Sequence, residues 1–148
     1  MRYALSMTIV TTTLLLCTAR PASAVLQFYQ VYKTEYLENH PDKKYVAEVD
    51  KGTNKCFVCH QGKKSRKNHN VFGKPLVELL DKKKDIKDKE KIKEALAKVA
   101  AMHVDPKDEK SETYLDRIKA SKWPGGELKQ LMEEPKEEKK DEKKAESK

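Results

Sequence analysis

The hydrophobic pattern of the chain is that of helices. Near the start, apolar positions recur every three or four residues, at Val25, Phe28, Tyr29, Tyr32 and Tyr36. Side chains at these intervals lie on one face of a helix. No stretch alternates apolar and polar residues as a half-buried strand does. The pattern predicts an all-α protein, with these rings covering the core or a dimer contact. The core is favoured, because a domain this small needs its rings inside.

The clearest helix is predicted over 88–104, where Pro106 ends the pattern. A shorter helix is expected to begin near Pro75, because proline is tolerated in a first helical turn. Another is expected around Tyr114, Leu115 and Ile118, and it ends before the break at 123–126. The apolar stripe of the 88–104 helix consists of Ile92, Ala95, Leu96, Val99, Ala100 and His103.

The two ends of the chain differ from the middle. Residues 1–24 combine an early arginine, an apolar run and the small residues Ala22-Ser23-Ala24, which is the pattern of a secretory signal cleaved after Ala24. Residues 133–148 carry 7 acidic and 6 basic side chains and only one apolar residue, Ala145, which predicts a charged, solvated tail. The expected working domain is therefore 25–132, in the periplasm or another exported compartment.

Composition limits what the domain can be. Of 148 residues, 37% are hydrophobic and 38% are charged, and the mean hydropathy is -0.88. So little apolar material cannot build a large two-layer core. The full chain has 32 basic and 24 acidic residues, and loss of the segment 1–24 leaves a net charge of +6. No membrane span is expected in the mature chain, and nucleic-acid binding is not expected, because aromatic and basic residues do not interleave.

One motif carries specific chemistry. Residues 56–60 read Cys56-Phe57-Val58-Cys59-His60, the C-x-x-C-H pattern of covalent haem attachment. Two thiols about one turn apart can each form a thioether to the porphyrin, and the adjacent histidine supplies the proximal iron ligand. We therefore expect one haem c per chain, held by Cys56 and Cys59, with its iron bound by His60. The covalent macrocycle would also complete a core that the sequence alone leaves small.

Other uses of the motif fit less well. A disulfide between Cys56 and Cys59 would close a very short loop and stabilise little. A thioredoxin-like redox pair needs a neighbouring strand–helix–strand unit, which is not predicted here. A zinc site needs further cysteine or histidine ligands at close spacing, and no second such pair follows.

The motif lies in a short, lysine-rich, helical sequence that resembles monohaem c-type cytochromes. The stretches Asn70-Val71-Phe72-Gly73 and Trp123-Pro124-Gly125-Gly126 are similar to small cytochromes of planctomycete and anammox bacteria, and the resemblance covers about 25–132. It implies a compact helical haem domain that carries electrons and is not an enzyme, located in the anammoxosome lumen if the organism is an anammox bacterium. Some anammox relatives bind iron through a distal cysteine, and the mature chain has no cysteine left for that role.

The sequence does not determine the sixth iron ligand. Met102 is favoured, because it lies 42 residues beyond His60 and small cytochromes c supply a methionine from a later segment. His103 is the alternative, because it is central in the predicted apolar stripe. A methionine ligand would raise the reduction potential and a second histidine would lower it. The candidates are Met102, His103, Met132, His69 and His40.

Lysines follow the motif closely. Residues 63–98 contain 13 basic and 6 acidic side chains, a field that would steer redox partners with acidic docking surfaces to the haem edge. The same lysines can equally serve solubility alone. The function predicted from the sequence is electron transfer. The alternative is a protein, or an accessory cytochrome subunit, that binds nitric oxide or carbon monoxide at a weak or open distal position.

Overall fold

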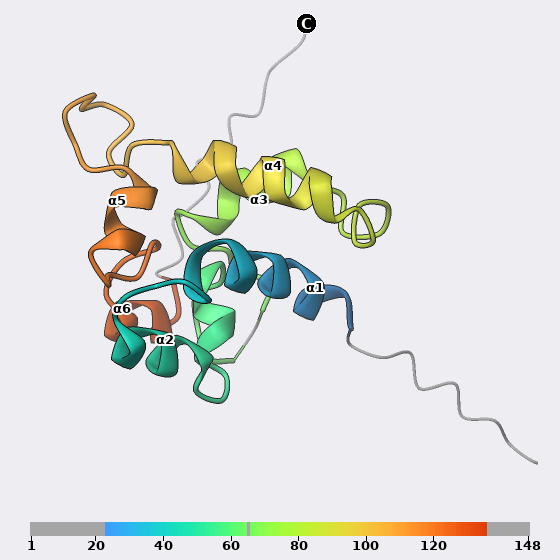
Figure 1. Ribbon diagram of the computed structural model, residues 1–148, viewed down its shortest axis with the longest axis horizontal. Coiled ribbons are helices and arrows are strands. Elements are labelled where there is room, and N and C mark those ends of the chain that lie inside the picture. Colours follow the sequence, from blue (N-terminus) through green and yellow to red (C-terminus); the bar gives the residue numbers. More distant parts are fainter. Residues whose placement is uncertain (1–22, 65, 136–148) are drawn as a thin grey trace, which may run out of the picture.

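The computed structural model describes residues 23–64 and 66–135. The predicted signal segment, apart from its last two residues, and the tail beyond Pro135 lie outside the described residues. The described part is mostly helical, as the hydrophobic pattern predicts, with two isolated β-bridges. Its elements (Figure 1) are α1 (Ser23–Tyr32), the π-helical turn η1 (Lys33–Leu37), α2 (Lys43–Asp50), the 3₁₀ turn η2 (Asn54–Val58), α3 (Gly73–Leu79), α4 (Lys89–Ala100), α5 (Tyr114–Lys119) and α6 (Leu128–Met132).

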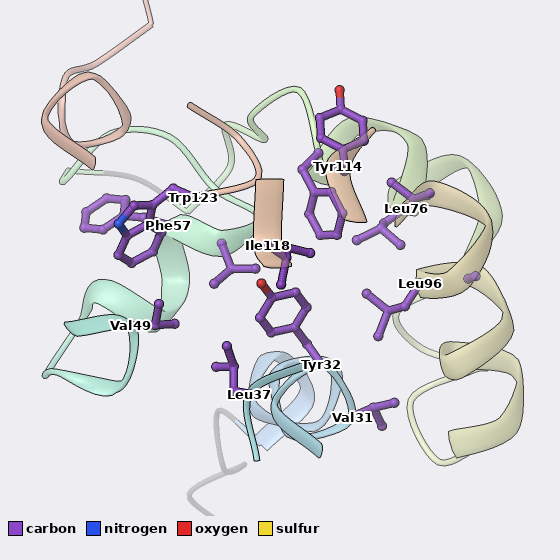
Figure 2. Close-up of a cluster of buried hydrophobic side chains, with 14 of the residues drawn as sticks. Val31, Tyr32, Leu37, Val49, Phe57, Leu76, Leu96, Tyr114, Ile118 and Trp123 are labelled. Carbon is purple, nitrogen blue, oxygen red and sulfur yellow. The ribbon is translucent and has the colours of Figure 1, made fainter. Parts of the chain in front are cut away.

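The helices surround one hydrophobic core. α4 packs against α1 and α3, while η2 contacts α2 and α6 on the other side of the molecule. Tyr32 stands at the centre of the core, with its ring rising from α1 toward Ile118 of α5 (Figure 2). Leu96 faces it from α4. Burial of a large apolar side chain contributes about 1.5–3 kcal/mol, so a few such residues hold these short helices together.

Polar side chains set the helix starts. The Asp42 carboxylate accepts hydrogen bonds from the Lys44 and Tyr45 amides at the start of α2. Asp88 accepts one from the Lys91 amide at the start of α4. Thr113 begins α5 with a capping box that is closed by Asp116. Each cap satisfies amides that have no partner within the helix.

The helix predicted over 88–104 ends earlier, at Ala100. The residues predicted to continue the helix leave it because their backbone pairs with residues 112–114. The Val104 amide donates to the Glu112 carbonyl at 2.9 Å, and the Tyr114 amide donates to the Met102 carbonyl at 3.1 Å. The predicted helices near Pro75 and Tyr114 are confirmed as α3 and α5. None of the helices in the described ranges is long and apolar enough to cross a membrane.

Candidate haem-attachment site

The C-x-x-C-H segment forms a tight turn that continues η2. The amides of Cys59 and His60 both donate to the Cys56 carbonyl, at 3.3 and 2.9 Å. This turn directs Cys56, Cys59 and His60 to one cavity of about 110 Å³. The structure therefore brings together the three residues that the motif predicts to work together.

The rest of the cavity wall is almost entirely apolar or aromatic. α1 contributes three rings, and α3 with the residue after it contributes aliphatic side chains. Val77 is 54% exposed where it lines this wall. These wall residues are Phe28, Tyr29, Tyr32, Leu76, Val77 and Leu80.

Asn70 joins the motif to α3. Its side-chain amide donates to the carbonyls of Phe57 and Val58 at 2.8 and 3.1 Å. Its carbonyl oxygen accepts from the amides of Phe72 and Gly73 at 3.1 and 2.9 Å. Asn70 is only 2% exposed, so these bonds replace water for backbone groups that would otherwise be buried without partners. This single side chain therefore fixes the position of the turn relative to α3.

Gly73 allows α3 to begin directly against the motif. A Cβ atom at this position would overlap the Cys59 carbonyl oxygen and lie 2.8 Å from the Cys59 carbonyl carbon. These are backbone atoms, which cannot move aside as the end of a flexible side chain can. Any larger residue would push α3 away from the cysteines and open the cavity.

The hydrogen bond and the burial of His60 are those that suit a metal-binding histidine. Its Nδ1 lies 3.2 Å from the Asn68 carbonyl oxygen, and because a carbonyl can only accept, Nδ1 carries the proton. The Nε2 lone pair is therefore free, and a backbone carbonyl on the other nitrogen is the usual way that proteins orient a ligating histidine. Burial, followed by the charges of His69 and Arg66, lowers the pKa of His60. The ring is thus held neutral, as metal binding requires.

The two thiols are free in the structure. Burial, and the neighbouring Cys56, raise the pKa of the Cys59 thiol to about 12. Among the described residues, no three His, Cys, Asp or Glu side chains come together as a metal-binding group. Two thiols, a histidine and a largely apolar wall are the donor set and surroundings that suit a covalently attached macrocycle.

His69 lies beside His60. The two residues pair across an isolated bridge, their ring centroids are 4.6 Å apart, and both line the cavity. Residues paired in this way have Cα atoms about 5 Å apart and direct their side chains to the same face. A macrocycle does not fit between the two rings, so His69 stands on the His60 side of the site. It is therefore not placed to be the sixth ligand.

Two other candidates have structural roles. His40 is buried, its Nε2–H donates to the Ile118 carbonyl at 2.8 Å, and its Nδ1 accepts from the Asp42 amide at 3.2 Å. Both ring nitrogens are therefore occupied. Met132 is half-buried and packs against the hydrophobic core at the end of α6.

Met102 and His103 lie apart from the cysteines. Both line a surface pocket with Val71, Pro75 and others, and no residue of that pocket lines the cysteine cavity. Met102 is 41% exposed. The Nδ1–H of His103 donates to the Ser111 carbonyl at 2.6 Å. Ligation by Met102 stays a prediction, and it would require the 101–113 segment to move toward the cavity.

Sequence reasoning gave Asn70 and Gly73 no structural role. The one signal was the stretch Asn70-Val71-Phe72-Gly73, which carries part of the resemblance noted above. The chain matches no protein-family model, no curated protein and no solved structure.

Proposed function

We propose that this protein is a monohaem c-type cytochrome that carries electrons in an exported compartment. The observation that carries the proposal is the cavity that Cys56, Cys59 and His60 line together between largely apolar walls. Haem supplies one-electron chemistry at its iron when it is bound. The protein's part is to hold the group, fill its axial position and keep water away.

Each residue of the site has a defined part in this function. Cys56 and Cys59 provide the thioether sulfurs, and His60 offers Nε2 to the iron. The Asn68 carbonyl fixes the tautomer and orientation of the imidazole. Asn70 holds the turn that carries all three attachment residues. Lysines along 63–98 support docking of partners with acidic surfaces.

The size of the cavity indicates how a haem would lie. A volume of about 110 Å³ is less than the roughly 150 Å³ in which an engineered protein cavity holds a benzene-sized ligand. A haem attached to Cys56 and Cys59 would therefore extend beyond the cavity, and the apolar residues that line the cavity would cover part of the macrocycle.

A second candidate function is binding of a small gas. It is favoured by one observation, which is that the cavity lining contains no methionine and no histidine besides His60 and its neighbour His69. An iron site without a strong sixth ligand accepts nitric oxide or carbon monoxide. The protein would then be a sensor, a scavenger or an accessory subunit.

The decisive experiment is expression of the full chain together with a cytochrome maturation system. We expect a c-type absorption spectrum and a haem that stays on the chain under denaturing conditions. Cys56→Ala, Cys59→Ala and the double variant should lose covalent haem stepwise, and the matched control Cys17→Ala should keep it. Absence of covalent haem in the parent protein would overturn the proposal.

The same preparation separates the two functions. A low-spin reduced spectrum that carbon monoxide leaves unchanged supports the electron carrier. If Met102→Leu abolishes a sulfur-to-iron charge-transfer band, Met102 is the ligand, and His103→Asn tests the alternative in the same way. A spectrum that shifts with carbon monoxide and is unaffected by either substitution supports the gas-binding function.

A further inference from the structure

A polar groove continues from the cysteine cavity. The two share the lining residues Phe28, His60, His69, Val77 and Leu80. The groove includes His60 and His69 but is not lined by Cys56 or Cys59. Its basic side chains are Arg66, Lys82, Lys84 and Lys91, and its acidic ones are Glu78, Asp81 and Asp85.

Two of the three acidic side chains of the groove, Asp81 and Asp85, are engaged by donors of the protein itself. Asp85 pairs with Lys91 at 2.8 Å and also accepts from the Asp81 amide at 2.8 Å. The Asp81 carboxylate accepts from the amides of Lys83 and Lys84. Hydrogen bonds and neighbouring lysines hold the pKa of both carboxyls below the usual value, so both are ionised at neutral pH.

Arg66 and Lys82, in contrast, make no ion pair with any described residue. Arg66 is half-buried, its guanidinium carbon lies 5.2 Å from the centroid of the Phe57 ring, and one Nη donates to the Gly62 carbonyl at 3.1 Å. This contact leaves other guanidinium donors available. An arginine held against a ring is well suited to bind a carboxylate through two hydrogen bonds.

Haem carries two carboxylates, which are suitable ligands for these cations. The carboxylate-bearing propionate side chains of the porphyrin lie on the edge opposite the vinyl groups that form thioethers. A macrocycle that is joined to Cys56 and Cys59 and centred over His60 would therefore extend its propionates into the groove. We propose that Arg66 and Lys82 bind the haem propionates, an inference that rests on the proposed function.

The test compares Arg66→Gln and Lys82→Gln with Lys98→Gln, which removes an exposed lysine of α4 that does not line the groove. Each variant of the matured full chain is examined by redox titration and by resonance Raman spectroscopy of the propionate bending vibration. For Arg66→Gln we expect the equilibrium constant for haem reduction to fall about tenfold, which is 59 mV for a one-electron couple. The propionate vibration should also fall in frequency. Lys82→Gln should cause smaller changes of the same sign.

Arg66→Lys should restore most of the potential while leaving a weaker propionate contact, because lysine keeps the charge but lacks the planar fork. If Arg66→Gln lowers the potential but leaves the propionate vibration unchanged, the charge acts through space and the proposal is wrong. It is equally wrong if both glutamine variants behave like Lys98→Gln. If covalent haem is present in every variant, either of these results leaves the proposed function intact, whereas absence of haem in the parent protein overturns both.

Discussion

Asn70 is the side chain on which the geometry of the site most depends. Asn70→Ala would leave the Phe57 and Val58 carbonyls and the Phe72 and Gly73 amides without their partner. Buried groups left unpaired cost about 1–3 kcal/mol each when water cannot replace the bond, and part of that cost is relieved by relaxation. We expect a loss of about 2–4 kcal/mol in the free energy of unfolding.

The measurement is urea unfolding followed by far-UV circular dichroism. Asn39→Ala is the matched control, because Asn39 is exposed in the turn before α2 and substitutions at such positions change stability by about 0.5 kcal/mol or less. Equal midpoints for the two variants would show that Asn70 does not hold the turn.

Removal of the Tyr32 hydroxyl should stabilise the protein, in contrast to removal of the Asn70 side chain. Its hydroxyl is buried at the centre of the core and has no hydrogen-bond partner of acceptable geometry among the described residues. Burial, and the nearby Tyr45 hydroxyl, raise the pKa of Tyr32 well above its usual value. Tyr32→Phe removes an unpaired polar atom at almost constant shape, so we expect a gain of about 1 kcal/mol in stability.

Tyr45→Phe should do the reverse. The Tyr45 hydroxyl donates to the Lys122 carbonyl at 3.1 Å, and removing that bond should cost about 1 kcal/mol. Thermal unfolding of both variants measures the two changes in stability, an increase for Tyr32→Phe and a decrease for Tyr45→Phe. A loss of stability in Tyr32→Phe would show that the Tyr32 hydroxyl makes a stabilising hydrogen bond, and would contradict the prediction.

Helix α2 is stabilised at neutral pH by the ionised carboxylate of its N-cap residue, Asp42. Hydrogen bonds from the Tyr45 amide, and then from the Ser121 side chain, lower the pKa of Asp42. A carboxyl with a lowered folded-state pKa stabilises the protein above the unfolded-state value of about 3.9. That stabilisation is lost as the pH falls through the folded-state pKa below it.

Asp42→Asn retains a good N-cap but cannot ionise. We therefore expect the parent protein to be more stable than Asp42→Asn at pH 7 and the difference to shrink below about pH 4. Urea midpoints at several pH values measure this, with Glu94→Gln on the exposed side of α4 as the control for loss of a carboxylate elsewhere. A difference between parent and Asp42→Asn that stays constant from pH 7 to pH 3 contradicts the role of the charge.

The elements that sequence reasoning predicted are those whose apolar residues repeat within the helix itself. α4 is an example, because Ile92, Leu96 and Val99 identify its buried face without any knowledge of its neighbours. Its end at Ala100 was not predicted, since it depends on hydrogen bonds to residues 112–114. α2 was missed because it buries only Tyr45 and Val49 among charged residues, too few to show a period.

The same distinction applies to the site. Cys56, Cys59 and His60 were predicted because the chemistry of haem attachment fixes their spacing along the chain. Asn70 could not be assigned a role, because its partners Phe57 and Val58 are brought to it only by the fold. The preference for Met102 rested on its distance along the chain from His60, which does not fix where the fold places the residue. The alternative, His103, rested on the apolar stripe of a helix that ends at Ala100, before His103 is reached.

The distribution of charge over the molecule leads to a prediction about partners. The 80–88 loop with its lysines and the 101–113 loop lie at opposite ends of the molecule (Figure 1). Lys84 lines the groove that opens from the cysteine cavity, so the first loop adjoins the proposed haem edge. A positive field there would guide an acidic partner to the point of electron transfer, whereas lysines that serve only solubility would act equally from either loop.

Stopped-flow reduction by a small acidic flavoprotein tests this difference. We expect the second-order rate constant to fall about tenfold or more between 10 and 300 mM ionic strength, because salt screens the attraction over about one Debye length. Lys83→Gln combined with Lys84→Gln should lower the low-salt rate severalfold, and Lys107→Gln combined with Lys110→Gln should leave it nearly unchanged. Equal effects of the two pairs would show that net charge alone sets the rate. A rate that rises with salt would instead show that the acidic flavoprotein is repelled, and would contradict a positive docking face.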